Sequence, residues 1–375
     1  MTTSLRLRGI ALLLVAVLMM VLLAACGDDD DDGNGSGDVT STTAATAAAG
    51  TATTAGNATE PASGDTGTPD AGDQALTKVS VALDWYPWSN HTGFYMALAN
   101  DYFKAEGLDV NIYVPSDPTT ALQLIAAGKD DFTISYQADV LLARSQGLEV
   151  KSVAALVQHP LNTIMALESS NITTAEDLAG KKIGITGVPS DEALLGTVLE
   201  EAGLTTDDVE MVNVGFDLMP ALLSGQVDAI IGGYWVHESI LAEQQGSPVT
   251  ALRVEELGVP DYYELLLVTS DKLVNESPDM VAGFMRALAK GYADAAANPG
   301  QAIDELVAAY PETSEDVERE GIQLIIPYWT DDGAVAWGTQ TEERWNSYAD
   351  WLRDTGILTD DVNVSEAWTN QFIEQ

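Results

Sequence analysis

Strand and helix patterns alternate along most of the chain, and this alternation limits its fold more than any other feature. Short apolar runs, many of them rich in β-branched residues, are separated by amphipathic runs with the helical period. We predict strands at Val79–Leu83, Asp109–Val114, Phe132–Ser135, Val150–Val157, Asn162–Leu167, Lys182–Thr186, Val209–Val214, Ala229–Ile231 and Tyr262–Thr269. Such alternation favours an α/β fold with parallel-type sheets flanked by helices.

Two strand–helix sets followed by a return strand predict two lobes. We expect two crossing strands, Asn162–Leu167 and Tyr262–Thr269, to join them. Lobe I then comprises residues 78–161 and 269–375, and lobe II comprises residues 162–268 with both crossing strands. Tryptophans recur at helical spacing in the C-terminal part of the chain, which indicates core positions rather than cofactor contacts.

Residues 1–25 have the pattern of an export signal. Arg6 and Arg8 precede the apolar run Ile10–Leu22, and small residues precede Cys26. This ending resembles the bacterial lipoprotein lipobox, which implies cleavage before Cys26 and lipidation of its thiol. The protein is then expected at the cell membrane, lipid-anchored on the extracytoplasmic side. The alternative is a membrane-spanning anchor, although the run is shorter than the ~20 residues that a span requires.

Residues 26–77 are expected to be a lipidated cysteine followed by an acidic tether. The tether has no Lys, Arg or aromatic residue, so it cannot bury enough apolar surface to offset chain entropy. The net charge is −42, and two Arg in the signal and ten acids in the tether leave −34 for the rest. So acidic a body repels nucleic acid, and we expect a monomer without a nucleic-acid partner. Cys26 is the only cysteine, which excludes internal disulfides and cysteine-based metal sites.

Aromatic and polar side chains gather immediately after the first predicted strand, in the segment DWYPWSNH. Asp84, Trp85, Trp88, Asn90 and His91 combine ring surfaces with carboxylate, amide and imidazole groups. At the carboxyl end of a strand, this combination suits recognition of a flat heterocycle. The alternative is that Trp85 and Trp88 only fill the edge of the domain.

Other candidates lie near the ends of later strands. Tyr136 follows one predicted strand, and Gln158 precedes the first crossing. After Ala229–Ile231 two glycines permit a tight turn. Beyond that turn, Tyr234 and Trp235 are placed to close over the other face of a ligand.

Glu238 is the candidate that would recognise hydrogen-bond donors. Its carboxylate can accept charge-assisted bonds from an exocyclic amine or a ring N–H. The alternative is a first-turn glutamate that favours the helix dipole. The three histidines, His91, His159 and His237, lack metal-ligand spacing, so we expect no metal, and we expect His237 to be solvated.

Several longer segments resemble the sequences of one family, and they occur in the same order. They are LDWYPWSNHTGFYMAL, ISYQADVLLAR, AALVQHPLNTIMAL, NVGFDLMPALLSGQVDAIIGGYWVHE and LGVPDYYELLLV. They resemble solute-binding proteins of ABC importers related to the formylaminopyrimidine-binding protein and to the yeast-type thiamine-pyrimidine synthase. The resemblance implies a two-lobed periplasmic-binding-protein fold of type II, or Venus flytrap, with the ligand between the lobes. It also implies a permease and an ATPase as partners, and site roles for His91 and Glu238.

The synthase in this family makes catalysis the main alternative. It uses a lysine-bound pyridoxal phosphate, a histidine and a cysteine-rich segment. By the resemblance, these positions hold Ser135, Asp139 and Val259–Tyr263 in this chain. Because a Schiff base needs an amine, we expect a binding protein without enzyme activity and without a cofactor.

The resemblance favours a thiamine-pyrimidine precursor, formylaminopyrimidine or hydroxymethylpyrimidine, as the ligand. Riboflavin is the alternative, because Trp88 stands where pyrimidine-binding relatives often have a small polar residue. Sulfonate or taurine fits less well, since an anion would face Asp84, Glu238 and the acidic body.

Overall fold

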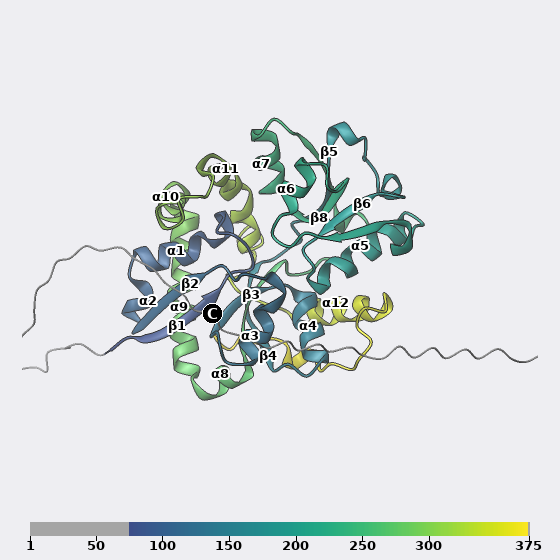
Figure 1. The fold of residues 1–375 in the computed structure, drawn as a ribbon. Coiled ribbons are helices and arrows are strands. Elements are labelled where there is room, and N and C mark those ends of the chain that lie inside the picture. The colour runs from purple at the N-terminus through teal and green to yellow at the C-terminus, as the bar shows by residue number, and fades with distance from the viewer. Residues whose placement is uncertain (1–74, 374–375) are drawn as a thin grey trace, which may run out of the picture. The chain divides into compact units, whose positions relative to one another are not determined.

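The computed structural model describes residues 75–373, which contain two five-stranded sheets with helices packed around them (Figure 1). The predicted signal, the lipidation site Cys26 and the predicted tether as far as residue 74 lie outside the described residues. None of the helices within residues 75–373 has the length and apolar character needed to cross a membrane.

The first sheet has the strand order β2-β1-β3-β10-β4. Its strands are β1 (Thr77–Ala82), β2 (Leu108–Tyr113), β3 (Phe132–Ser135), β4 (Val150–Val157) and β10 (Leu265–Ser270). β1 pairs in parallel with β2 and β3, as the alternation predicts. β10 instead runs antiparallel between β3 and β4. The strand predicted at 262–269 as a lobe II crossing therefore belongs to the first sheet, where a central position explains its continuous apolar run.

The second sheet has the strand order β7-β6-β8-β5-β9. Its strands are β5 (Asn162–Leu167), β6 (Lys182–Ile185), β7 (Glu210–Asn213), β8 (Ala229–Tyr234) and β9 (Val249–Arg253). β6 pairs in parallel with β7 and β8, whereas β5 is antiparallel to β8 and β9. The sheets are therefore mixed, with parallel pairs built from the strand–helix units.

Gly232 lies inside β8, whereas we expected it in a turn after the strand. The pairing of β8 with β5 shifts register between Thr163 and Ile164, and Gly232 sits at this bulge with φ +98°. Glycine adopts that conformation at no steric cost. The strand continues past the bulge as far as Tyr234, which is its last residue and lies shortly before α7 in the chain.

Helices flank both sheets and make up most of the C-terminal part of the chain (Figure 1). Within the described residues they are α1 (Thr92–Ala99), α2 (Tyr102–Ala105), α3 (Ala121–Ala126), α4 (Gln137–Ser145), α5 (Pro189–Glu201), α6 (Leu218–Leu223), α7 (Glu238–Gln244), α8 (Asp271–Glu276), α9 (Pro278–Ala297), α10 (Pro299–Ala309), α11 (Glu315–Ile325) and α12 (Glu342–Asp354). We use "first lobe" for β1–β4, β10, α1–α4 and α8–α12, and "second lobe" for β5–β9 and α5–α7. Of the five tryptophans predicted at core positions in the C-terminal part, Trp329 and Trp345 are buried, whereas Trp337, Trp351 and Trp368 are partly buried against the core.

The helix α9 fixes the segment that follows β1. A Cβ added at Gly291 would lie 2.1 Å from the carbonyl oxygen of Gly93, so glycine is needed for α9 to approach α1 this closely. The next residue, Tyr292, donates its hydroxyl to the carbonyl oxygen of Asn90 at 2.8 Å. Contacts from α9 therefore fix the end of the aromatic segment 84–91.

Candidate functional site

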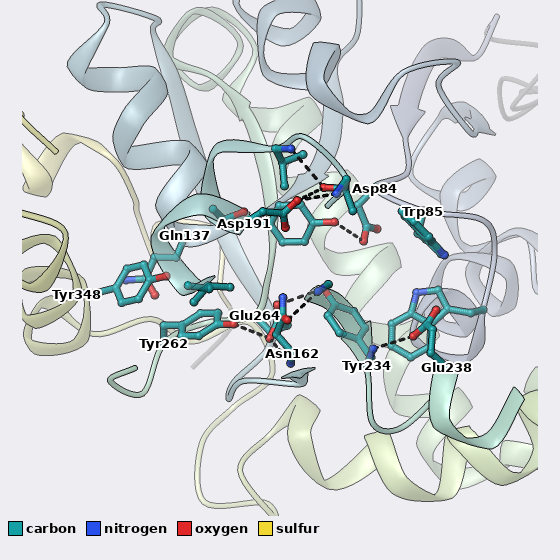
Figure 2. A pocket seen from close by; sticks show the side chains of 17 residues that line it. Asp84, Trp85, Gln137, Asn162, Asp191, Tyr234, Glu238, Tyr262, Glu264 and Tyr348 are labelled. Atoms are coloured by element: carbon teal, nitrogen blue, oxygen red, sulfur yellow. Dashed lines mark hydrogen bonds between the residues drawn. The ribbon is translucent and has the colours of Figure 1, made fainter. Parts of the chain in front are cut away.

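A cavity lies where residues of the two lobes meet, at the carboxyl ends of β1, β3, β6 and β8 (Figure 2). It is lined by Asp84, Trp85, Trp88, Tyr136, Gln137, Asn162, Thr186, Val188, Ser190, Asp191, Leu194, Gly232, Tyr234, Glu238, Tyr262, Glu264 and Tyr348. Six of the ten predicted ligand residues are among them, namely Asp84, Trp85, Trp88, Tyr136, Tyr234 and Glu238. This is the edge of parallel strands at which α/β proteins bind small molecules.

The cavity is narrow, with a volume of about 30 Å³. Ligand pockets usually measure about 300–1,000 Å³. A second cavity of about 230 Å³ adjoins it and shares Asp84, Tyr136 and Val188. A third, of about 350 Å³, shares Trp85 and Glu238. Tyr136 and Trp85 therefore stand between larger spaces, and a ring-sized ligand needs movement of these side chains or of the lobes.

Asp84 is oriented by His91. The backbone N–H of Trp88 donates to His91 Nδ1 at 3.2 Å, so this nitrogen is the acceptor and the ring proton lies on Nε2. His91 Nε2 then donates to Asp84 Oδ1 at 3.0 Å. The other carboxylate oxygen of Asp84 faces the hydroxyl of Tyr136 at 3.4 Å. His91 lies behind the cavity wall and acts on it through Asp84.

Trp88 and Trp85 both contact the second lobe. The Trp88 side chain is buried, and its ring lies 5.7 Å from that of Tyr234 and 5.4 Å from that of His237. Trp85 packs against Phe216 at 4.9 Å between ring centroids. The two tryptophans therefore fill an edge, as the alternative interpretation held, and also form the wall of the cavity.

Glu238 is buried and already has two protein partners. Its Oε2 accepts from the backbone N–H of Tyr234 at 2.8 Å, and its Oε1 accepts from His237 Nδ1 at 2.8 Å. The other ring nitrogen of His237 lies 3.0 Å from Glu318 Oε1. Glu318 Oε2 accepts from the backbone N–H of Ser89 at 2.6 Å. These bonds connect the second lobe to the first.

We expected His237 to be solvated. Its imidazole instead lies between two carboxylates, those of Glu238 and Glu318. Burial alone lowers the pKa of His237, but the charges of Glu238 and Glu318 outweigh it and raise the pKa well above its usual value. The imidazolium form satisfies both acceptors at once. The sequence signal was present in the pair His237–Glu238, but Glu318 is too distant in the chain to suggest the second partner.

Four predicted ligand residues lie outside the cavity. Asn90 Oδ1 accepts from the indole N–H of Trp329 at 3.2 Å, and Gln158 Nε2 donates to the carbonyl of Thr339 at 3.1 Å. Trp235 lies under the guanidinium of Arg253, 4.6 Å from the ring centroid. His91, described above, is the fourth. Each of them supports the chain near the cavity and does not line it.

Glu264 is a cavity residue that the sequence did not suggest. It is 1% exposed, and its carboxylate accepts from the backbone N–H groups of Leu161 (2.6 Å) and Asn162 (3.1 Å). It also accepts from the hydroxyls of Tyr262 (2.9 Å) and Tyr234 (3.2 Å). Burial raises the pKa of Glu264 to about 7. The available signal was an acid placed between a tyrosine pair and an apolar strand, in YYELLLV.

Two more buried acids face each other across the lobes. Asp191 Oδ2 accepts from the backbone N–H and the hydroxyl of Thr186, both at 2.7 Å, and burial raises its pKa to about 6. Asp139, on α4, accepts from the backbone N–H of Ser190 at 2.9 Å. Burial, and after it the charge of Asp191, raises the pKa of Asp139 to about 7. Within residues 75–373, no group of three or more His, Cys, Asp or Glu side chains is arranged to hold a metal ion.

Comparison with known proteins agrees with this arrangement. A family model described as NMT1/THI5 like matches residues 88–302. The chain is 36% identical over 302 residues to the formylaminopyrimidine-binding protein of Halalkalibacterium halodurans, covering 80% of this chain and 91% of that protein. It is 29% identical over 337 residues to the riboflavin-binding protein RibY of Chloroflexus aurantiacus, covering 86% and 94%.

An enzyme and a solved structure are also similar. The 4-amino-5-hydroxymethyl-2-methylpyrimidine phosphate synthase THI5 of Saccharomyces cerevisiae is 27% identical over 312 residues, covering 79% of this chain and 88% of that protein. The alkanesulfonate-binding protein SsuA from Xanthomonas axonopodis pv. citri, bound to MOPS, superposes with a TM-score of 0.63 at 18% identity, covering 80% and 99%. The last match shows a shared two-lobed fold.

Proposed function

Because this chain belongs to the NMT1/THI5-like family, we propose that it is the solute-binding lipoprotein of an ABC importer. Its ligand in this proposal is a small aromatic nitrogen heterocycle, a thiamine-pyrimidine precursor such as formylaminopyrimidine or hydroxymethylpyrimidine. A solute-binding role follows from relatives named as binding proteins and from the fold of the solved neighbour. The export-signal pattern of residues 1–25 supports an extracytoplasmic location.

The observation that carries the proposal is a cavity with aromatic walls and carboxylates contributed by both lobes. Trp88 and Tyr234 supply flat apolar surfaces from opposite lobes, 5.7 Å apart between ring centroids. Asp84 and Glu238 supply acceptors from opposite lobes. An aminopyrimidine offers a flat ring and N–H donors, which match these groups. A sulfonate would bring an anion to the same carboxylates, which is unfavourable.

Riboflavin is the second candidate, and the adjoining 350 Å³ cavity favours it. That cavity is lined by Trp85, Tyr86 and Phe216 among others. Riboflavin has about 27 non-hydrogen atoms against about 12 for the pyrimidine, so it can use more surface at modest efficiency per atom. If Trp85 moves, the central cavity and this one form a longer site.

We infer that the protein binds its ligand without transforming it. By the family resemblance, Ser135 and Asp139 occupy the positions of the synthase's lysine and histidine, and both line the 230 Å³ cavity. A serine hydroxyl cannot form the Schiff base that a lysine amine forms. Incubating the purified protein with pyridoxal phosphate should therefore release no pyrimidine.

The test is to identify the ligand that the purified protein carries. Mass spectrometry of the solute released on denaturation should detect a pyrimidine precursor or a flavin. Calorimetry with formylaminopyrimidine and riboflavin then ranks the two. A sulfonate recovered from the protein, with no binding of either heterocycle, would contradict the proposal.

A further inference from the structure

Two amide side chains in the central cavity have donors without acceptors. Gln137 is fully buried, and its Oε1 accepts from the backbone N–H of Tyr263 at 2.9 Å. Its Nε2 has no hydrogen-bond partner. Asn162 is 5% exposed, and its Oδ1 accepts from the backbone N–H of Gly232 at 3.0 Å. Its Nδ2 donates to no group in the part of the chain that the structure describes.

The backbone fixes the orientation of each amide. A backbone N–H can only donate, so the oxygens of Gln137 and Asn162 must point at Tyr263 and Gly232. Turning either amide over would leave two donors facing each other. The amino groups are therefore the ends that remain for another partner, and both residues line the cavity.

These donors complement the carboxylates of the same cavity. In Figure 2, Gln137 lies beside Tyr348, whereas Glu238 lies near Tyr234 on the other side of the view. The cavity therefore offers the amide N–H groups of Gln137 and Asn162 as well as carboxylate oxygens. A buried donor left unpaired is costly, and a bound acceptor removes that cost.

We propose that Gln137 and Asn162 donate hydrogen bonds to the acceptor edge of the ligand. This inference rests on the proposed function and narrows its ligand class. The ligand is an uncharged planar heterocycle with a ring nitrogen or carbonyl oxygen on one edge and N–H groups on another. The amides reject analogues that lack the acceptor, because binding such an analogue buries the amide without a partner.

The test exchanges each donor for an acceptor of the same shape. Gln137→Glu and Asn162→Asp keep an oxygen for the backbone N–H but turn the amino group into a second oxygen. Binding of formylaminopyrimidine and riboflavin is measured by calorimetry on the full-length protein in detergent. We expect each variant to bind the wild-type ligand about 10- to 100-fold more weakly at pH 8.

Acidic pH should restore binding in these variants. A protonated carboxyl carries an O–H and can donate again, so the ratio of variant to wild-type affinity should rise toward one as the pH falls to 5. Comparing the ratio at each pH cancels the titration of other acids in the cavity.

Gln340→Glu is the matched control. Gln340 is 2% exposed, and its Oε1 accepts from Ser152 Oγ and from Trp345 Nε1 at 2.7 and 3.1 Å. It does not line the cavity, so the exchange should leave ligand affinity as in wild type. Thermal melting of each unliganded variant reports folding, and either cavity variant suffices if the other does not fold.

The binding measurements distinguish failure of this inference from failure of the proposed function. If wild type binds one heterocycle and Gln137→Glu and Asn162→Asp bind it equally well at pH 8, the inference is wrong and the proposed function stands. If wild type binds neither heterocycle, the proposed function fails and the inference fails with it.

Discussion

His237 and Glu318 form a largely buried ion pair between the two lobes, with 3.0 Å between Nε2 and Oε1. His237 precedes α7 of the second lobe, and Glu318 lies on α11 of the first. The same glutamate accepts the backbone N–H of Ser89, in the segment that carries Trp88. The contact therefore joins the aromatic wall of the cavity to the second lobe.

Glu318→Gln should weaken this interlobe contact. The variant retains one oxygen, which can accept from Ser89 or from His237 but lacks the charge that pairs with the imidazolium. We expect the free energy of unfolding to fall by about 1.5–3 kcal/mol at pH 7, measured by denaturant titration. Glu315→Gln on the same helix is the control, because Glu315 is half exposed and its pair with Arg319 is screened by water. Equal losses in the two variants would show that the buried pair adds nothing.

The contribution of His237 should depend on pH. Its pKa is raised in the folded protein, so its stabilising effect is complete below the unfolded value near 6.5. The effect is lost as the pH rises through the folded pKa, which lies well above 6.5. The difference in unfolding free energy between wild type and His237→Gln should therefore be largest at pH 6 and shrink toward alkaline pH. A difference that stays constant would contradict a protonated His237.

Cys26→Ala should release the protein from the membrane. If the thiol carries the lipid, its loss moves the protein from the detergent phase to the aqueous phase and leaves the signal uncleaved or miscut. Detergent phase partitioning followed by immunoblotting measures this. Cys26→Ala protein that still enters the detergent phase would identify the apolar run Ile10–Leu22 as the anchor.

The alternation of patterns predicted the parallel units of both sheets but not the place of β10. A fully apolar run such as Leu265–Val268 carries no sign of which sheet it joins, because it is buried on both faces in either. Gly232 shows a related limit. Two adjacent glycines suggest a turn, and only the pairing with β5 reveals a bulge within the strand.

The site was predictable where aromatics and acids follow a strand directly, as at Asp84, Trp88 and Glu238. It was not predictable where two distant segments meet. His91 and Asn90 are polar residues of the same segment as the cavity residues, but their side chains bond elsewhere. His91 bonds Asp84, and Asn90 accepts from Trp329. Gln137 follows the predicted strand Phe132–Ser135 almost directly, so its place near the cavity could be read from local sequence. Glu264 lines the cavity because β10 returns to the first sheet, which local sequence does not show.

Asp139→Asn should stabilise the unliganded protein at alkaline pH. The folded pKa of Asp139 is about 7, well above the value near 3.9 of an unfolded Asp, so the folded protein favours the protonated form. Its charged form therefore costs stability progressively as the pH rises from about 4 to 7. Asparagine stays neutral and retains an oxygen for the backbone N–H of Ser190. We expect no difference from wild type at pH 4 and a gain on the order of 2–4 kcal/mol at pH 8, from denaturant titrations.

The control for this variant is Asp360→Asn, which removes one charge at an exposed position. It separates the buried site from the general relief of repulsion in a chain of net charge −42. Asp360→Asn should change stability by a few tenths of a kcal/mol at either pH. A loss of stability in Asp139→Asn at pH 8 would mean that the carboxylate of Asp139 is needed in its charged form. In that case the negative charge of Asp139 would strengthen its bond to Ser190 between the lobes by more than burial of the charge costs.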